Sequence, residues 1–412
     1  MELKNDISTP GVINTGFRYL KRHKVLSTLA IYNFLLAVFV ILIVSFLYFF
    51  SPKAKVFYER KLDRIVNQIL NSPKNYLVSL SDNVETEQIS IDIRFKNFLK
   101  LKQKRRIALK KGVLESSDDD YVNAMIKYKE KTLKVKLRLK GDWIEHLRGE
   151  KWSFRVIVSG ENSLMGMKKF SLQRPYTRNY IHEWIYHQAL KREGVLGLRY
   201  DFVDITLNGK PLGIYAIEEA WDKRLIENNN LREGVIVKFN DKGFWRGAQR
   251  ELEFSSKCER NCFVNNDVDN SEINFYSLNK TLETPELKKQ LYAAKNLFSR
   301  FIGGKISFSQ IFDINKYAKY NAITRIFGAT HGLAWYNSRY YFNPVTSRFE
   351  PIGFDGMPGF KIGVSSSGEI DYPAELEYVK IYLSTLARLS KKKYMDRLLE
   401  DIGEELDKKL KI

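Results

Sequence analysis

The sequence has few residues of the kinds that build disulfides or zinc sites. It contains two cysteines, Cys258 and Cys262 in the segment CERNC, and five histidines. A zinc site would need a second pair of ligands nearby, and none is present. A small loop disulfide and two thiols on one helical turn fit the spacing equally well. The cysteines therefore argue against a zinc module and leave the redox compartment open.

Several catalytic and nucleic-acid-binding signatures are also absent. No GxSxG, HExxH or GxGxxG segment occurs, and no Cys–His pair suggests a nucleophile. RNP, zinc-finger and helix-turn-helix signatures are missing too, so nucleic acid is not expected as a partner. His182 and His187 lie five residues apart, which does not place them on one helical face as metal ligands.

Acidic residues are outnumbered by basic ones. The 48 Asp and Glu oppose 68 Lys and Arg, giving a formal net charge of +20. Such an excess favours anionic partners, such as nucleotide phosphates, anionic lipids or acidic glycans. A hydrophobic share of 44% excludes wholesale disorder, and 412 residues suffice for one large domain or two smaller ones.

One long segment lacks charge altogether. From Val25 to Ser51 no charged residue occurs, and a helix of this length crosses a hydrocarbon core of about 30 Å. The short N-terminal tail ends in the basic cluster at 21–24, which favours a cytoplasmic N-terminus. The sequence therefore predicts a single-pass inner-membrane protein with residues 52–412 outside the cytoplasm.

The pattern beyond residue 51 predicts an α+β fold: a mixed sheet with helices packed on it and a helical C-terminal lobe. Alternating segments predict several strands, and Asn208-Gly209 predicts a tight hairpin between two of them. The expected organisation is a tail at 1–24, a membrane helix at 25–51, a juxtamembrane helix and strand at 52–112, and a main domain at 113–412 with a polar insertion at about 240–285.

Two blocks of sequence resemble the CotH kinase family, the atypical protein kinases of the spore coat protein H type. The first begins with LKGDWIEHLRGEKWSFRVIV at 139–158 and runs through the Asn-Gly hairpin to a strand that ends in Glu. The second is HGLAWYNSRYYFNPVTSRFEPIGFDGMPGF at 331–360. The resemblance implies a kinase-like main domain over about half of the chain.

The resemblance also implies roles for particular residues. Lys151 matches a strand lysine that contacts nucleotide phosphate, and Glu219 matches the acid that pairs with it. Glu218 takes that role if the register is off by one. The other two matches are Asn337, an expected Mg²⁺ ligand, and Asp355, the expected catalytic and metal-binding acid.

Two departures from the family pattern bear on activity. Gly353 stands where a first acid of an Asp-x-Asp pair is expected, and His331-Gly332 stands where a catalytic acid is expected. A histidine suits proton abstraction because its unperturbed pKa is about 6.5, so His331 is a candidate base. The loss of an acid weakens metal binding and makes a pseudokinase the competing interpretation.

The resemblance therefore leads to one main functional expectation and two alternatives. The main one is a membrane-anchored protein that binds Mg²⁺ or Mn²⁺ with ATP or another nucleotide and transfers phosphate to a protein hydroxyl or a surface glycan. The first alternative is a catalytically inactive scaffold in cell-surface or exopolysaccharide assembly. The second is a module that binds anionic polysaccharide. Expected partners are the bilayer through 25–51, a nucleotide, and a protein or anionic glycan substrate.

Overall fold

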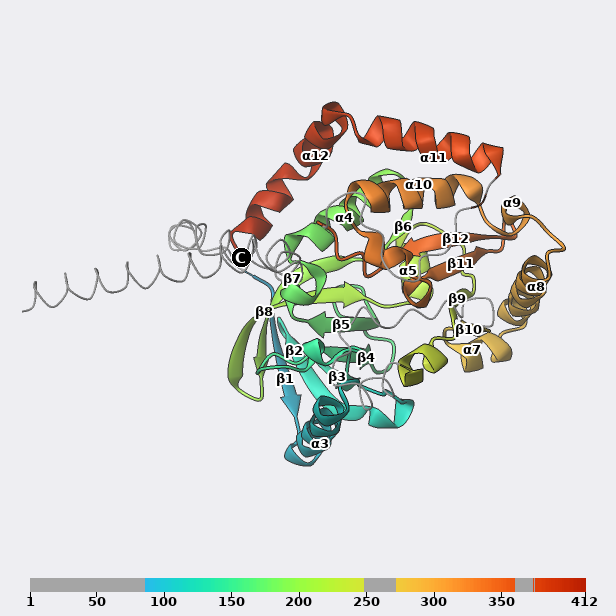
Figure 1. The fold of residues 1–412 in the computed structure, drawn as a ribbon. Coiled ribbons are helices and arrows are strands. Elements are labelled where there is room, and N and C mark those ends of the chain that lie inside the picture. The colour runs from blue at the N-terminus through green and yellow to red at the C-terminus, as the bar shows by residue number, and fades with distance from the viewer. Residues whose placement is uncertain (1–85, 248–271, 360–372, 374) are drawn as a thin grey trace, which may run out of the picture. The chain divides into compact units, whose positions relative to one another are not determined.

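Seven strands close into a barrel in the N-terminal part of the described chain (Figure 1). The computed structural model describes residues 86–247, 272–359, 373 and 375–412. Around the barrel the strand order is β1-β2-β3-β4-β5-β8-β7. The strands are β1 (Gln88–Ile93), β2 (Val122–Tyr128), β3 (Lys131–Leu139), β4 (Phe154–Val158), β5 (Lys169–Gln173), β7 (Tyr200–Leu207) and β8 (Lys210–Glu219).

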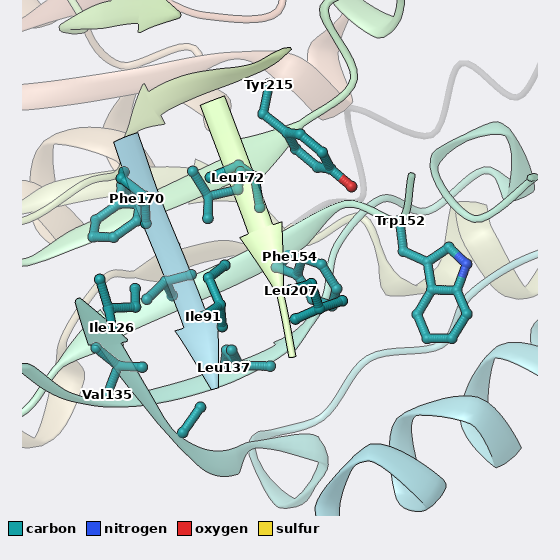
Figure 2. Close-up of a cluster of buried hydrophobic side chains, with 14 of the residues drawn as sticks. Ile91, Ile126, Val135, Leu137, Trp152, Phe154, Phe170, Leu172, Leu207 and Tyr215 are labelled. Carbon is teal, nitrogen blue, oxygen red and sulfur yellow. The ribbon is translucent and has the colours of Figure 1, made fainter. Parts of the chain in front are cut away.

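Apolar side chains fill the barrel. Successive side chains of a strand point to opposite faces, and the apolar set of each strand points inward. Figure 2 shows Ile91, Leu137, Phe154, Phe170 and Leu172 meeting there, and all five are fully buried. The interior is therefore a packed core, and the polar side chains of the same strands lie on the outer face.

The hairpin between β7 and β8 helps to close the barrel. Asn208 and Gly209 both have positive φ, 49° and 77°, which is the backbone of the tight turn that the sequence predicted. Asn208 Oδ1 accepts the Ile93 N–H at 2.6 Å. Parallel pairing of Gln88–Ile91 with Asp204–Leu207 then joins the first strand to β7.

A second, five-stranded sheet has the order β10-β9-β11-β12-β6. Its strands are β10 (Ile273–Phe275), β9 (Ile236–Phe239), β11 (Arg339–Asn343), β12 (Arg348–Gly353) and β6 (Leu196–Gly197). β12 pairs parallel to β6, and the other pairs are antiparallel.

Helices pack around the two sheets. α4 (Ile181–Arg192) contacts the outer face of the barrel through Trp184 and contacts α10 (Ile314–Ile326) through Tyr186 and Leu190. The remaining α-helices are α3 (Phe95–Lys111), α5 (Lys223–Asn228), α7 (Leu278–Glu283), α8 (Pro285–Ile302), α9 (Phe308–Ile311), α11 (Leu376–Leu389) and α12 (Lys392–Leu410). Short 3₁₀ turns include η3 (Pro175–Arg178), η6 (Thr330–Leu333) and η7 (Trp335–Asn337).

The single mixed sheet expected from the sequence is wrong. The chain is α+β, but its strands form a closed barrel and a separate sheet. β1 and α3, which lie in the predicted 52–112 region, belong to the same compact unit as the barrel, Val84–Ile412. Cys258 and Cys262, for which the sequence left a disulfide and two thiols equally open, lie outside the described residues.

The predicted single-pass membrane protein is also corrected. Among the residues that the structure describes, no helix combines the length and the apolar character that a membrane crossing requires. The expected span at 25–51 lies outside those residues. The membrane helix and the inner-membrane location built on it are therefore not supported.

Candidate functional site

A row of polar side chains crosses five neighbouring strands on the outer face of the barrel. The residues, paired in register from β3 to β7, are Arg138, Arg155, Ser171, Glu218 and Tyr200. Directly paired residues in an antiparallel sheet point to the same face, so these five side chains lie in one line. Their neighbours along each strand fill the barrel interior, which leaves this face for polar chemistry.

Glu218 lies at the centre of a buried ionic cluster. Its side chain is fully buried, with Lys140 Nζ 3.1 Å from Oε2 and Arg178 Nε 3.2 Å from Oε1. Burial would raise the pKa of Glu218, but the cations of Lys140 and Arg178 outweigh it and hold that pKa well below its usual range. Glu218 is therefore ionised and fixed between two cations.

Lys140 follows directly after β3 and is almost fully buried. Its Nζ donates to Gln173 as well as to Glu218. Burial, together with the nearby charge of Arg178, lowers the pKa of Lys140 to about 8, although Glu218 acts in the opposite direction. The ammonium group is therefore charged at neutral pH and close to losing its proton.

Arg178 links Glu218 to the turn after β12. Its Nη1 lies 2.7 Å from Asp355 Oδ1 and donates to the Thr177 carbonyl at 3.2 Å. On its other side, Asp355 has Oδ2 3.8 Å from His331 Nε2. Lys140, Gln173, Arg178, Glu218 and Asp355 are called the Glu218 cluster below.

The turn that carries Asp355 is held by a buried acid on α4. Asp355 has a φ of 52° and Met357 a φ of 47°, so this short segment departs from extended backbone. Glu183, which is fully buried, accepts the N–H of Gly356 at 3.1 Å and that of Met357 at 2.9 Å. Glu183 therefore positions the Asp355 turn without belonging to the cluster.

An aromatic group adjoins the polar row. Trp221 stacks on Tyr276 at 4.9 Å and meets Phe354 edge-on at 4.7 Å, measured between ring centroids. The guanidinium of Arg155 lies 5.2 Å from the Trp221 ring, and that of Arg339 lies 5.1 Å from it. The cation–π contact of Arg155 leaves its guanidinium N–H groups available to a ligand, whereas Arg339 Nη1 donates to the Tyr336 and Ser338 carbonyls.

Arg155 lies on the polar row itself, and no carboxylate of the described residues forms a direct ion pair with it. Within the described residues, the side chain of Arg155 makes neither an ion pair nor a hydrogen bond. Among the described residues, Ser171 Oγ in the row and Gln173 Nε2 in the Glu218 cluster are buried and have no hydrogen-bond partner. Buried polar groups are normally satisfied, so these groups indicate a place for a polar ligand.

The first pair of residues predicted from the sequence is not brought together. Glu219 faces the opposite side of β8 from Glu218 and is bound by Arg199, whose backbone N–H donates to Oε2 at 3.1 Å. Lys151 instead donates to the Ile214 carbonyl at 3.3 Å. The Lys151–Glu219 ion pair is thus not formed among the described residues, and the alternative acid, Glu218, lies in the cluster.

The later residues do lie together. Asn337 Nδ2 donates to the His331 carbonyl at 3.0 Å, and the His331 ring lies beside Asp355. These contacts bring the three sequence-predicted residues of the second block to one place. They do not by themselves assign a metal-binding or catalytic role to any of them.

The sequence interpretation missed Lys140, Arg178 and Glu183. Lys140 stands within the quoted block, and its position just after a strand of alternating charge was a usable signal. Arg178 and Glu183 had no such signal, because each acts on residues far away in sequence: Arg178 on Asp355, and Glu183 on the following turn. Only the tertiary structure identifies them.

Comparison with known proteins identifies the family of this chain. Residues 137–411 match the family model described as CotH kinase protein. A search of curated proteins found no match. Because the family model covers more than half of the chain, this protein belongs to the CotH kinase family.

Proposed function

We propose that this kinase-like protein binds the phosphate groups of a nucleotide at the Glu218 cluster and Arg155. The observation that carries the proposal is the guanidinium of Arg155, which lies on the polar row beside Ser171 and forms no direct ion pair within the described residues. Guanidinium groups bind phosphate oxygens through paired N–H donors. The two unpartnered polar groups, Ser171 Oγ and Gln173 Nε2, add to the capacity for a phosphate ligand.

The Lys140–Glu218 pair supports the same proposal. Phosphoryl transfer needs a cation fixed toward the donor phosphates, and in protein kinases a strand lysine held by an acid supplies it. Lys140 has this arrangement, since Glu218 is buried and also held by Arg178. We propose that Lys140 fills the role that the resemblance implied for Lys151, and that Glu218, the alternative acid, fills the role implied for Glu219.

We further propose phosphoryl transfer to a hydroxyl of a protein or surface glycan, with His331 as the base. The acceptor oxygen forms a bond to the γ-phosphorus while its proton passes to His331 Nε2. The bond from phosphorus to the β–γ bridging oxygen breaks, and the nucleoside diphosphate leaves. The His331 side chain is 29% exposed, so an acceptor can reach it, and Asp355 lies beside Nε2.

A noncatalytic function is the second candidate, either a scaffold or a binder of anionic glycan. It is favoured by the position of Arg178, which neutralises the one late acid that the family pattern reserves for chemistry. The net charge of +20 fits an anionic ligand in either case.

The test uses the full chain with ATP labelled at the γ-phosphate. We expect ATP to raise the free energy of unfolding by about 2.7 kcal/mol at one hundred times its dissociation constant. Transfer of label to the chain or to an added acceptor, lost in His331→Asn, supports catalysis. Stabilisation without transfer supports the scaffold. The absence of both stabilisation and transfer would reject the nucleotide site.

Replacing Arg155 tests the phosphate contact directly. Arg155→Gln should weaken ATP binding about tenfold or more, because a charge-assisted contact contributes on the order of 1.5–3 kcal/mol. The unfolding midpoint should move little, since no described residue depends on Arg155 for an ion pair. Isothermal titration calorimetry measures the affinity.

The matched control for this variant is Lys136→Gln. Lys136 is exposed on the same face of the barrel, and its register partner is Ile157 rather than a residue of the polar row. An equal loss of ATP affinity in both variants would show that the effect comes from general surface charge. Arg155 would then not be part of the binding site.

The pKa of Lys140 predicts a pH dependence of binding. Its folded-state pKa, about 8, lies below the usual value of about 10.4. The side chain is therefore positively charged at pH 7, and this charge is lost as the pH rises through 8. ATP affinity should therefore fall by about tenfold between pH 7 and pH 9.

Lys140→Arg provides the comparison, because a guanidinium keeps its charge throughout this range. Calorimetric titrations of both proteins at pH 7, 8 and 9 measure the effect. A fall of the same size in the arginine variant would show that another group controls the pH dependence.

A further inference from the structure

Arg178 forms an ion pair with Asp355, the acid for which the family resemblance implied a metal-binding role. Arg178 is 3% exposed, its Nη1 lies 2.7 Å from Asp355 Oδ1, and its Nε is held by Glu218. Nη1 also donates to the Thr177 carbonyl. With three attachments in a buried setting, this guanidinium is a fixed part of the site.

The residues around Asp355 do not fit a magnesium site. Mg²⁺ requires near-octahedral oxygen ligands at about 2.0–2.1 Å. Within the described residues, no group of three or more His, Cys, Asp or Glu side chains is placed to hold a metal. Asp355 itself has Arg178 on one oxygen and His331 near the other. A second cation beside Arg178 would be repelled by it.

Moving Arg178 aside would not easily open the site. Its departure would leave Asp355 without its close cation and Glu218 with Lys140 as its remaining contact at hydrogen-bond distance. Charges that lose a buried partner are strongly destabilised. The position of Arg178 is therefore stable against exchange for a hydrated ion.

We infer that Arg178 is a built-in replacement for the divalent cation, so that the site binds a metal-free nucleotide or polyphosphate anion. The guanidinium neutralises Asp355 and presents positive charge to the phosphates, which are the two electrostatic tasks of a bound metal. Lys140 and Arg155 add two further positive charges. The inference goes beyond the proposed nucleotide site by stating the form of the ligand.

Mn²⁺ alone, titrated into the full chain, tests the inference without any nucleotide. The parent and Asp355→Asn should bind the same number of Mn²⁺ ions, as followed by electron paramagnetic resonance. Arg178→Met should gain one ion, and the gain should vanish in Arg178→Met/Asp355→Asn. Arg174→Met, on the same segment, is the control and should gain none.

One additional Mn²⁺ in the parent relative to Asp355→Asn would overturn the inference. This comparison remains decisive even if Arg178→Met fails to fold, because neither of the two proteins lacks the arginine.

A second experiment, which rests on the proposed function, compares ATP affinity in excess EDTA and in excess Mg²⁺. We expect the two dissociation constants to agree within about threefold. Binding at least tenfold weaker in EDTA would contradict the inference. If ATP binds in neither condition, the proposed nucleotide site fails, and the Mn²⁺ comparison decides the role of Arg178 by itself.

Discussion

Glu218→Gln is expected to lower the free energy of unfolding by about 3–5 kcal/mol, the usual cost of breaking a buried ionic group by removing one partner. The amide keeps the volume of the side chain but removes the charge that holds Lys140 and Arg178. Lys140 would then lose its paired carboxylate, and Arg178 would keep Asp355 as its paired carboxylate. Urea unfolding, with the slope as well as the midpoint recorded, measures the change.

Glu219→Gln is the matched control for Glu218→Gln. The two acids are adjacent on β8 and both are buried, but Glu219 pairs with Arg199, whose side chain is 28% exposed. Water can therefore compensate part of that loss, and a smaller destabilisation is expected. Equal losses of unfolding free energy in the two variants would show that the Glu218 cluster stabilises the fold no more than the Glu219–Arg199 pair does.

The same acid predicts a pH dependence of stability. The pKa of Glu218 in the folded protein is depressed below its unfolded value of about 4.3. The stability that it contributes is therefore present above that pH and is lost as the pH falls below it. Glu218→Gln should lack this part of the acid sensitivity, so the parent and the variant should approach each other in stability at low pH.

The local structure of the barrel could be read from the sequence, and its closure could not. Strict alternation of apolar residues marks β1, β2 and β3, since one face of each fills the core. The Asn-Gly turn identifies one hairpin. Closure depends on the parallel pairing of Gln88–Ile91 with Asp204–Leu207, more than one hundred residues away, and neither segment carries a local signal for it.

The second sheet is harder to predict for a different reason. Every residue of β11 is buried, so that strand shows no alternation between apolar and polar faces. β6 and β10 have two and three residues, too few for any period to be recognised. These strands are defined by their neighbours rather than by their own sequences.

In the candidate site, too, some features could be predicted from the local sequence and others depend on contacts between distant residues. Asn337, His331 and Asp355 belong to one short block, so a family resemblance places them together correctly. The choice between Glu218 and Glu219 depends on a single step of register, which decides whether the acid faces the barrel interior or the polar row. Arg178 reaches Asp355 only through the packing of η3 against the turn after β12, which no local pattern reveals.

Gly353→Asp, which restores the acid that the family pattern expects, is predicted to destabilise the protein by more than about 3 kcal/mol and to gain no metal site. A Cβ at position 353 would lie 2.2 Å from Leu190 Cδ1 and 3.5 Å from the Leu196 carbonyl oxygen. Overpacking of this kind costs about 1–3 kcal/mol, and the buried carboxylate adds its own desolvation cost.

We therefore explain the glycine at position 353 by the close packing of β12 against α4. On this explanation, the surrounding residues are not a metal site that has lost one acid. Gly403→Asp on α12 is the control, because a Cβ there meets nothing within 4 Å and little stability should be lost. Thermal unfolding and Mn²⁺ titration of both variants measure the two effects. If Gly353→Asp folds like the parent and binds an additional Mn²⁺ ion, position 353 faces the site, and both the packing explanation and the metal-free role of Arg178 are wrong.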